Sequence, residues 1–516
     1  MTNKDINRRN FLRLAGASAA GIVASGCTTA PQSASEPVDG SLKAKGFGDS
    51  RAEQTHPQAS AFPRGRLPAE AATLPAGKPN FIIIFCDDMG YGDLGCFGSK
   101  KHRTLNIDRM AAEGTRFTSF YVTSGVCTPS RSSLMTGCYP RRVSMHKSAK
   151  NEWVLFPVAR KGLNPSEITI AELLKERGYA TACVGKWHLG DQPEFLPTRQ
   201  GFDYYYGIPY SNDMGSRQRR QNPPLPLMRN EKVIEAPANQ YTLTKRYTEE
   251  VIKFITANKD KPFFVYLPHT MVHNPVHSSG KFRGKSDNGG YGDATEEIDF
   301  STGEILATLK ELGVDDKTLV VFTSDNGAAK RWGGSNLPLS GYKGSTMEGG
   351  MREPCVMRWP GRIPEGRTCD ELTSTLDLLP TLAKLAGTKA PDDRIIDGKD
   401  IWPLMAGKRG AKSPHKAFYY YRMDQLQAVR SGKWKLHLPY EIRKKDQTTK
   451  ATLKLYDLDA DIGETTNVAD KHRKVVARLT ALAEKARRDL GDRNRKGNQR
   501  QAGLVVTPKP LTMSDN

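Results

Sequence analysis

Acidic and amide side chains follow two long apolar runs in this chain. Asp87 and Asp88 come directly after "NFIIIFC", and Asp325 and Asn326 come directly after "TLVVFTS". Continuous apolar runs of this kind are typical of parallel strands that are buried on both faces. Three carboxylates and one amide oxygen are oxygen ligands, which suit a hard cation such as Ca²⁺ or Mg²⁺ rather than zinc or copper.

Two further apolar segments end in basic or imidazole side chains. Lys186 and His188 lie at the end of "YATACVGKWHLG", and His269 and His273 lie at the end of "PFFVYLPHTMVHNP". A single "DD" or "DNG" is weak evidence for a site, because both are common in turns. In an open parallel sheet, however, the carboxyl ends of the strands bind ligands. Four strand ends that all carry such groups therefore predict one site.

A lone cysteine begins a predicted helix in "GVCTPSRSSLMTG". Thr128 is a good helix cap and Pro129 suits the first helical position, so Cys127 is expected at a helix N-terminus. Backbone N–H groups and the helix dipole favour an anion there, which predicts a nucleophilic thiol of low pKa. The alternative is an inert, buried cysteine.

Helical patterns separate the apolar strands and predict the fold. Strand and helix alternate along the chain, which indicates an α/β protein with a large, mostly parallel sheet flanked by helices. Beyond residue 400, short alternating strands and an amphipathic helix at 470–490 predict a smaller subdomain of antiparallel sheet plus helix. The helices between the strands are expected at 106–117, 169–178, 248–258 and 295–313.

The N-terminal residues read as an export signal followed by a tether. Arg8 and Arg9 precede Phe11, Leu12 and an Ala/Gly-rich run, the layout of a twin-arginine signal that directs folded proteins through the twin-arginine translocase. The run ends at Cys27, which is expected to carry a lipid anchor; simple cleavage to a soluble product is the alternative. The predicted location is the periplasm or the envelope surface of a bacterium.

The resulting domain scheme has four parts. It assigns 1–27 to the export signal, 28–77 to a Pro/Ser/Ala/Gly-rich tether, 78–400 to a catalytic domain, and 401–516 to the C-terminal subdomain with its basic tail. The tail at 485–500 is interpreted as a solvated, frayed helix rather than a binding arm.

The net charge of +21 over 516 residues points to an anionic partner. Nucleic acid is not expected, since no helix-turn-helix, zinc-finger or RNP pattern appears. A sulfated or carboxylated polysaccharide offers the same attraction, and a charge that serves solubility alone is the alternative. The eight cysteines form no C-x-x-C pairs, so neither a disulfide framework nor a zinc site is predicted.

Several motifs together resemble the type I, formylglycine-dependent sulfatases of the alkaline phosphatase superfamily, in their arylsulfatase A-like branch. They are C-x-P-S-R followed by "LMTG", "DDMGYGDLGCFG", "VGKWHLG", "GIPYSND", "SDNG" and "YKGSTMEGGMREP". The resemblance covers most of 78–470 and implies an alkaline-phosphatase-like fold and a sulfuric ester hydrolase of the arylsulfatase type. Cys138 departs from the pattern, because a basic residue usually stands there.

The resemblance also implies the chemistry. A maturation enzyme would oxidise Cys127 to formylglycine (3-oxoalanine), whose hydrate attacks the sulfur of a sulfate ester. Arg131 would hold the hydrate, and Asp325 would accept its proton. One Ca²⁺ is expected, with Mg²⁺ less so, held by Asp87, Asp88, Asp325, Asn326 and the modified Cys127.

The remaining roles concern the sulfate and the leaving group. Lys186, His273 and Lys343 would bind the sulfate oxygens, and either His273 or Lys343 would protonate the leaving alcohol. His188 would help to remove a proton from the second hydroxyl of the hydrate, so that the aldehyde reforms and expels sulfate. His269 has no assigned role and is expected to be structural. Further substrate contacts are predicted at Ser211, Asn212, Asp213 and Arg217, with Arg219 and Arg220.

The basic loop and the net charge favour a sulfated glycan as substrate, either an algal galactan such as carrageenan or a glycosaminoglycan. Two alternatives stay open at this point. One is a phosphoester or phosphonate hydrolase of the same superfamily, although a second metal site is not evident. The other is a surface protein that binds glycans without catalysis.

Overall fold

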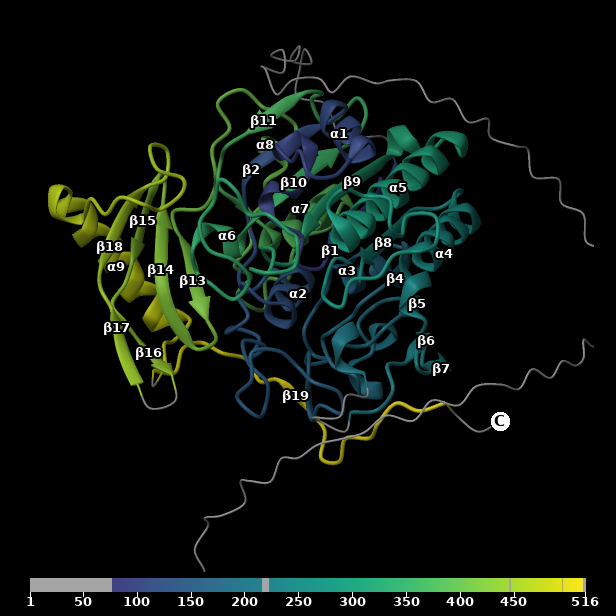
Figure 1. Ribbon diagram of the computed structural model, residues 1–516, viewed down its shortest axis with the longest axis horizontal. Coiled ribbons are helices and arrows are strands. Elements are labelled where there is room, and N and C mark those ends of the chain that lie inside the picture. The colour runs from purple at the N-terminus through teal and green to yellow at the C-terminus, as the bar shows by residue number, and fades with distance from the viewer. Residues whose placement is uncertain (1–76, 216–221, 445–446, 494, 514–516) are drawn as a thin grey trace, which may run out of the picture. The chain divides into compact units, whose positions relative to one another are not determined.

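The computed structural model describes residues 77–215, 222–444, 447–493 and 495–513, which belong to one compact unit (Figure 1). The predicted export signal with Cys27, and the predicted tether up to residue 76, lie outside the described residues. No helix in the described part of the chain combines the length and the apolar composition needed to span a membrane.

The unit is built around an 11-stranded sheet (Figure 1). Its strands are β1 (Asn80–Cys86), β2 (Thr115–Tyr121), β4 (Ala180–Val184), β5 (Tyr204–Gly207), β6 (Leu227–Arg229), β7 (Lys232–Glu235), β8 (Phe263–Pro268), β9 (Thr318–Ser324), β10 (Arg352–Arg358), β11 (Arg367–Cys369) and β12 (Thr373–Ser374).

The strand order places the two acid-bearing strands side by side. It runs β11-β2-β10-β9-β1-β8-β4-β5-β6-β7, with β12 paired to β2. The central strands β9, β1, β8, β4 and β5 are parallel, whereas β10, β6 and β7 run antiparallel to their neighbours. The prediction of a large mixed, mostly parallel sheet is confirmed.

Alternate residues of β1 point into different apolar clusters, which explains its continuous hydrophobic sequence. Phe81 and Ile83 belong to one cluster, and Ile82 and Ile84 to another, and all four are buried. A strand that is covered on both faces has apolar residues on both, so its sequence does not alternate between apolar and polar residues.

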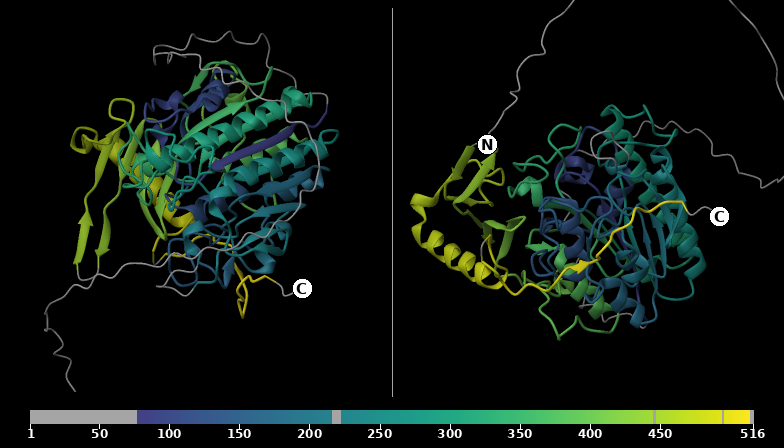
Figure 2. Two further views of the ribbon diagram at one scale, coloured as in Figure 1. Left: turned by 45° about the vertical axis from the view of Figure 1, so that its right-hand side comes forward. Right: turned by 90° about the horizontal axis from the view of Figure 1, so that it is seen from below.

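Helices cover both faces of the sheet (Figure 2). Residues of α2, α3 and α7 join the apolar cluster on one face, and residues of α1, α4 and α5 join the cluster on the other. The helices are α1 (Leu105–Ala112), α2 (Cys127–Thr136), α3 (Ile170–Glu176), α4 (Leu243–Asn258), α5 (Gly289–Glu311), α6 (Glu348–Met351), α7 (Leu378–Leu385) and α8 (Trp402–Met405).

One predicted helix is too long. The pattern at 106–117 predicted a single helix, but α1 ends at Ala112 and β2 begins at Thr115. A side chain on Gly114 would collide with the backbone of Met357, since an added Cβ would lie 2.4 Å from its carbonyl oxygen. The close approach of β10 therefore requires glycine at position 114, in the short connection between α1 and β2.

The C-terminal subdomain contains a four-stranded antiparallel sheet, in the order β13-β14-β15-β18, and a helix that packs on it. These elements confirm the predicted antiparallel sheet plus helix. A two-stranded hairpin, β16 (Tyr440–Lys444) and β17 (Gln447–Ala451), extends from the subdomain (Figure 1). The sheet and helix are β13 (Phe418–Arg422), β14 (Gln425–Ser431), β15 (Trp434–His437), β18 (Lys454–Asp457) and α9 (Arg473–Asp489).

The basic tail does not form the solvated helix expected at 485–500. Helix α9 ends at Asp489, and β19 (Gly503–Leu504) pairs with β3 (Lys161–Gly162) of the large domain. Arg500 forms an ion pair of 2.7 Å with Glu167 on the way. Contacts with residues that are distant in sequence therefore fix the position of this segment. Helical periodicity gives no information about such contacts.

Candidate active site

The predicted acidic residues meet at the carboxyl ends of β1 and β9. The two strands are parallel neighbours and their last residues are paired, so the residues that follow them lie side by side. The backbone N–H of Asp88 donates to Asp325 Oδ1 at 3.2 Å, and Asn326 Nδ2 donates to Asp88 Oδ1 at 2.7 Å. All four side chains, including that of Asp87, are buried.

The arrangement suits a metal ion. Asp87, Asp88, Cys127 and His273 each offer one ligand atom, and these atoms all lie within 4.8 Å of one another. The Oδ1 atom of Asn326 is buried and has no hydrogen-bond partner, so a lone pair is available for a ligand. A buried oxygen of this kind, next to carboxylates, fits a hard divalent cation.

Two cations neutralise the carboxylates from the sheet side and from α2. Lys186, which follows β4, contacts Asp87 through its ammonium group and lies 3.2 Å from Ser211 Oγ. Arg131 in α2 donates to Asp325 Oδ2 at 3.0 Å and 2.7 Å and lies 3.7 Å from Asp87. These side chains are fully buried, so their charges act in a poorly screened environment.

Lys343 supplies a third cation from a loop. Its ammonium nitrogen lies 2.8 Å from Asp88 Oδ2 and 3.9 Å from Cys127 Sγ. The next residue fixes the loop, because the N–H of Gly344 donates to the carbonyl of Gly125, just before α2, at 2.7 Å. Lys343 is therefore an ordered part of the site and not an ordinary loop lysine.

The charges shift the pKa values of the acids in opposite directions. Burial alone would raise the pKa of Asp87, but Lys186, His273 and Arg131 hold it well below its ordinary value. Burial and the neighbouring Asp87 raise the pKa of Asp325 to about 7, despite its hydrogen bonds from Arg131. Adjacent buried carboxylates resist joint ionisation, and a divalent cation would relieve that repulsion.

Cys127 lies at the centre of this cluster but is not a low-pKa thiol. Its Sγ is 3.6 Å from Asp87 Oδ1, and burial raises its pKa well above the ordinary value. The prediction from helix position is therefore wrong, because burial outweighs the helix end. The helix also begins two residues earlier than expected: Val126 is the N-cap, and Thr128 and Pro129 are the second and third helical residues.

The three histidines differ in their surroundings. His273 Nε2 lies 3.8 Å from Asp88 Oδ2, inside the cluster. His188 Nε2 lies 2.9 Å from the carbonyl of Leu155, its Nδ1 is buried without a partner, and burial holds its pKa well below the ordinary value. His269 is fully buried with both ring nitrogens unpaired, and burial lowers its pKa to about 3.

The predicted substrate contacts are only partly brought to the cluster. Ser211 belongs to the cluster, because its Oγ lies 3.2 Å from the ammonium nitrogen of Lys186. Asn212 donates its amide hydrogens to Gln240, at 3.0 Å, and to a backbone carbonyl, while its Oδ1 is buried and unpaired. Asp213 is partly buried, with one unpaired carboxylate oxygen. Arg217 and its neighbouring arginines lie outside the described residues.

Sequence reasoning missed three residues near Lys343: Trp153, Tyr342 and Arg422. Trp153 and Arg422 belong to none of the motifs, and Tyr342 is the first residue of "YKGSTMEGGMREP" but was given no role. Cys138, at the end of the cysteine motif, is buried, and its Sγ lies within 3.4 Å of two backbone carbonyls and of Arg500. It belongs to the core below α2 and not to the cluster.

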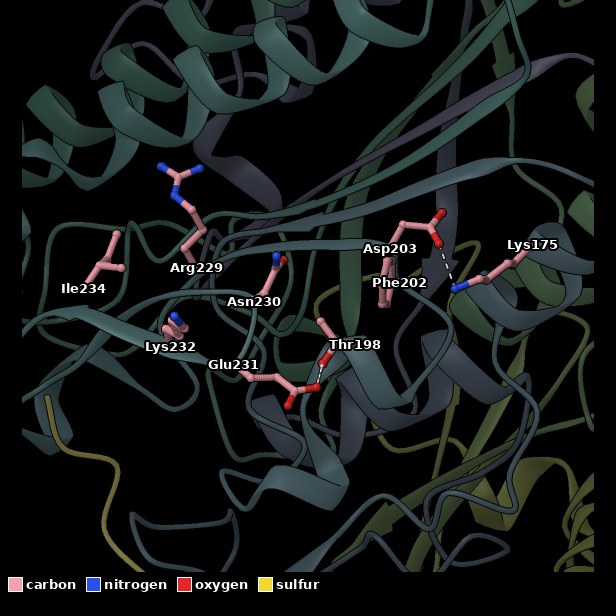
Figure 3. A pocket seen from close by; sticks show the side chains of 9 residues that line it. All are labelled: Lys175, Thr198, Phe202, Asp203, Arg229, Asn230, Glu231, Lys232 and Ile234. Carbon is pink, nitrogen blue, oxygen red and sulfur yellow. Dashed lines mark hydrogen bonds and ion pairs between the residues drawn. The ribbon is translucent and has the colours of Figure 1, made fainter. Parts of the chain in front are cut away.

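A cavity lies away from this cluster, beside strands β6 and β7 at one end of the sheet (Figure 3). It measures about 620 Å³, and ion pairs and hydrogen bonds between its lining side chains satisfy much of its charge, including Lys175 with Asp203 at 2.7 Å and Thr198 with Glu231 at 3.0 Å. It contains none of the predicted site residues, so the chemistry is assigned to the buried cluster.

Comparison with known proteins agrees with the geometry. A family model described as Sulfatase matches residues 79–388, and one described as N-sulphoglucosamine sulphohydrolase, C-terminal, matches residues 343–489. The N-acetylgalactosamine-6-sulfatase of Canis lupus familiaris is 42% identical over 377 residues, 70% of this chain and 71% of that protein. The arylsulfatase A of Homo sapiens is 40% identical over 448 residues, 79% of this chain and 86% of that protein.

Solved structures with the same architecture include sulfatases. A sulfatase from Pseudoalteromonas sp. matches with a TM-score of 0.70 and 27% identity, over 79% of this chain and 89% of that chain. Ps i-CgsB, whose structure has also been solved with k-i-k-neocarrahexaose, matches with a TM-score of 0.68 and 32% identity, over 79% and 92% of the two chains. The chain therefore belongs to the sulfatase family, with the alkaline-phosphatase-like fold, and it is a hydrolase of sulfate esters.

Proposed function

We propose that this sulfatase removes sulfate from a sulfated polysaccharide or oligosaccharide, using formylglycine made from Cys127 together with a bound Ca²⁺. The observation that carries the proposal is the position of Cys127, buried between Asp87 and Lys343. Burial raises the pKa of the Cys127 thiol, which favours a role that depends on conversion of this residue over a role as a thiolate nucleophile.

The donor set fits one hard cation. Asp87, Asp88, Asp325 and Asn326, with the modified residue at 127, would hold it through oxygen atoms alone, which favours Ca²⁺ over Mg²⁺ if the site keeps few waters. When bound, the ion would polarise a sulfate oxygen, and the hydrated aldehyde at position 127 would supply the hydroxyl group that attacks sulfur.

The protein's own side chains position and neutralise the substrate. Lys186, Lys343 and His273 surround Cys127 and would bind the sulfate oxygens, where negative charge develops in the transition state. Arg131 holds Asp325 in place to receive a proton from the nucleophile. Lys343 or His273 would deliver a proton to the leaving alcohol, since both lie at the mouth of the cluster rather than beneath it.

His188 is assigned to the second step. It would take a proton from the remaining hydroxyl group, so that sulfate leaves without attack of water on sulfur. Its Nδ1 is buried and unpaired, which leaves that nitrogen free to accept a proton, and burial keeps the ring neutral. A neutral imidazole is the form that can act as a base.

A glycan is the favoured substrate. The net charge of +21 attracts polyanions. The related N-acetylgalactosamine-6-sulfatase and the carrageenan-oligosaccharide complex of Ps i-CgsB are consistent with a sugar sulfate. We propose export by the twin-arginine translocase after maturation in the cytoplasm, followed by residence in the periplasm or attachment to the envelope through Cys27.

The test is release of inorganic sulfate, with phosphate assayed alongside, from a panel of carrageenans, glycosaminoglycans and their oligosaccharides. The protein should come from a host with a formylglycine-generating enzyme, and mass spectrometry should establish conversion of Cys127. Sulfate release by the wild type and none by Cys127→Ala is expected. Phosphate release alone would favour the phosphoester or phosphonate alternative. A converted protein that binds glycans but releases neither ion would favour the binding-protein alternative.

A further inference from the structure

Two exposed aromatic side chains flank the lysine that contacts Cys127. Trp153 and Tyr342 are each 42% exposed, which is high for residues of their size. Tyr342 directly precedes Lys343. The ring of Trp153 lies against the residue that follows, because a Cβ added to Gly344 would come within 2.8 Å of that ring. Both aromatic groups therefore stand at the mouth of the buried cluster.

The loop that carries Trp153 is held to the site by hydrogen bonds. The N–H of Leu155 donates to Thr128 Oγ1 at 3.2 Å, and its carbonyl oxygen lies 2.9 Å from His188 Nε2. Thr128 is the residue after Cys127 in α2. The position of the indole ring is thus set by the same residues that set the position of the nucleophile.

Arg422 adds a positive charge that is not paired with a carboxylate in the part of the chain that the structure describes. It is the last residue of β13, in the C-terminal subdomain, and its guanidinium carbon lies 4.4 Å from the centre of the Trp153 ring. Among the described residues its side chain makes no hydrogen bond or ion pair, and its Nε is buried without an acceptor. The turn after it is anchored, since Asp424 forms an ion pair of 3.2 Å with Lys147 and its carbonyl accepts from Arg141 at 3.0 Å.

Stacking on tryptophan by itself is a common structural role for arginine. Such an arginine normally also directs its N–H groups to an acceptor, because a partly buried guanidinium without one is costly. A second cation stands near the other aromatic residue: Lys330 Nζ lies 5.3 Å from the centre of the Tyr342 ring. Arg422 and Lys330, whose side chains have no acceptor within the described part of the chain, and the two exposed rings form a surface suited to an anionic, ring-shaped ligand.

We propose that Trp153 and Arg422, with Tyr342 and Lys330, form a second subsite for a sugar ring that carries its own anionic group. This sugar would be the neighbour of the sugar that loses its sulfate, so the inference rests on the proposed function. The aromatic surfaces contact the apolar face of the ring, and the guanidinium fork binds a sulfate or a carboxylate in two-point fashion. The enzyme accordingly prefers a chain with two adjacent anionic sugars.

The test compares three oligosaccharides of equal length. One carries only the scissile sulfate, one has a second sulfate on the neighbouring sugar, and one has a carboxylate there. The readout is the ratio of kcat/KM for each doubly charged substrate to that for the singly charged substrate. For the wild type we expect a ratio of roughly 10 or more, the effect of one charge-assisted contact. The larger of the two ratios identifies the anion that the subsite accepts.

The variants are chosen to isolate the guanidinium group. Arg422→Met is expected to bring the ratio close to 1, mainly through KM, and Arg422→Lys to leave an intermediate ratio because it keeps the charge without the fork. Trp153→Leu should lower the ratio as well. The matched control is Arg177→Met. It removes an exposed arginine that lies before the amino end of β4, whereas the site lies at the carboxyl end of that strand. This variant should keep the wild-type ratio.

The experiment distinguishes failure of the second subsite from failure of the proposed function. If the wild type releases sulfate but the ratio is near 1, or if Arg422→Met leaves the ratio unchanged, the second subsite is wrong while the proposed function stands. If the converted wild type releases sulfate from none of the oligosaccharides, the proposed function fails and the subsite fails with it.

Discussion

Arg131 donates two hydrogen bonds to one carboxylate oxygen of Asp325, at 3.0 Å and 2.7 Å, with both side chains fully buried. Arg131 lies one helical turn beyond Cys127, whereas Asp325 follows β9. The pair therefore fixes the helix that carries the nucleophile against the carboxyl-end edge of the sheet.

Removal of the arginine should destabilise the protein as well as inactivate it. In Arg131→Met the buried Asp325 loses its main cation, and loss of one partner of a buried pair typically costs about 3–5 kcal/mol. Arg131→Lys should lose less stability but still lose activity, since it cannot make both hydrogen bonds. Denaturant unfolding and kcat measure the two effects. A stability change below about 1 kcal/mol in Arg131→Met would contradict the role given to this pair.

The group that protonates the leaving alcohol can be identified from substrate chemistry. Replacement of that group should lower kcat for a sugar sulfate by about 10²–10⁴-fold, but much less for an aryl sulfate with an acidic phenol, which leaves without a proton. We expect this pattern for either Lys343→Met or His273→Ala. The variant that loses activity equally on both substrates has lost sulfate binding instead. If both variants behave that way, neither residue is the acid.

Calcium should stabilise the folded enzyme through Asn326. A ligand that binds only the folded state adds about 2.7 kcal/mol at 100 times its dissociation constant, so Tm should rise with added Ca²⁺ and less with Mg²⁺. Asn326→Leu removes the buried, unpaired Oδ1 and should raise the Ca²⁺ concentration needed on the order of 10–100-fold. Asn258→Leu, at the end of α4, is the control. Equal Ca²⁺ responses in both variants would exclude Asn326 as a ligand.

His146 should make the fold sensitive to acid. Burial, with the nearby cations Arg141, Lys161 and Lys147, lowers its pKa from 6.5 to about 3. The unfolded chain therefore binds a proton between about pH 6.5 and 3 that the folded chain does not, so stability present above pH 6.5 is lost as the pH falls, by about 1.4 kcal/mol per pH unit.

The measurement compares urea unfolding of the wild type and His146→Gln at pH 7, 5.5 and 4.5. The variant should lose stability less steeply below pH 6.5, because glutamine does not titrate. Parallel pH profiles for the two proteins would show that His146 does not carry this proton.

Much of the site could be predicted from the sequence. Asp87, Asp88, Asp325 and Asn326 follow apolar runs that are typical of doubly buried strands, and parallel strands bring their carboxyl ends to one edge. Lys186 was found by the same rule. The residues of the cysteine motif were found through their resemblance to a family, since helix position alone predicted the wrong state for the thiol.

The rest depends on contacts between segments that are far apart in sequence. The pKa of Cys127 is set by burial under loops from several parts of the chain, and no local pattern reports that burial. Arg422 lies 269 positions after Trp153, yet the two are in contact. The strands, the family and the acidic cluster could thus be predicted along the chain, because they follow from short-range periodicity and contiguous motifs. The raised pKa of the thiol, the course of the tail and the residues at the mouth of the site could not, because each results from packing between distant elements.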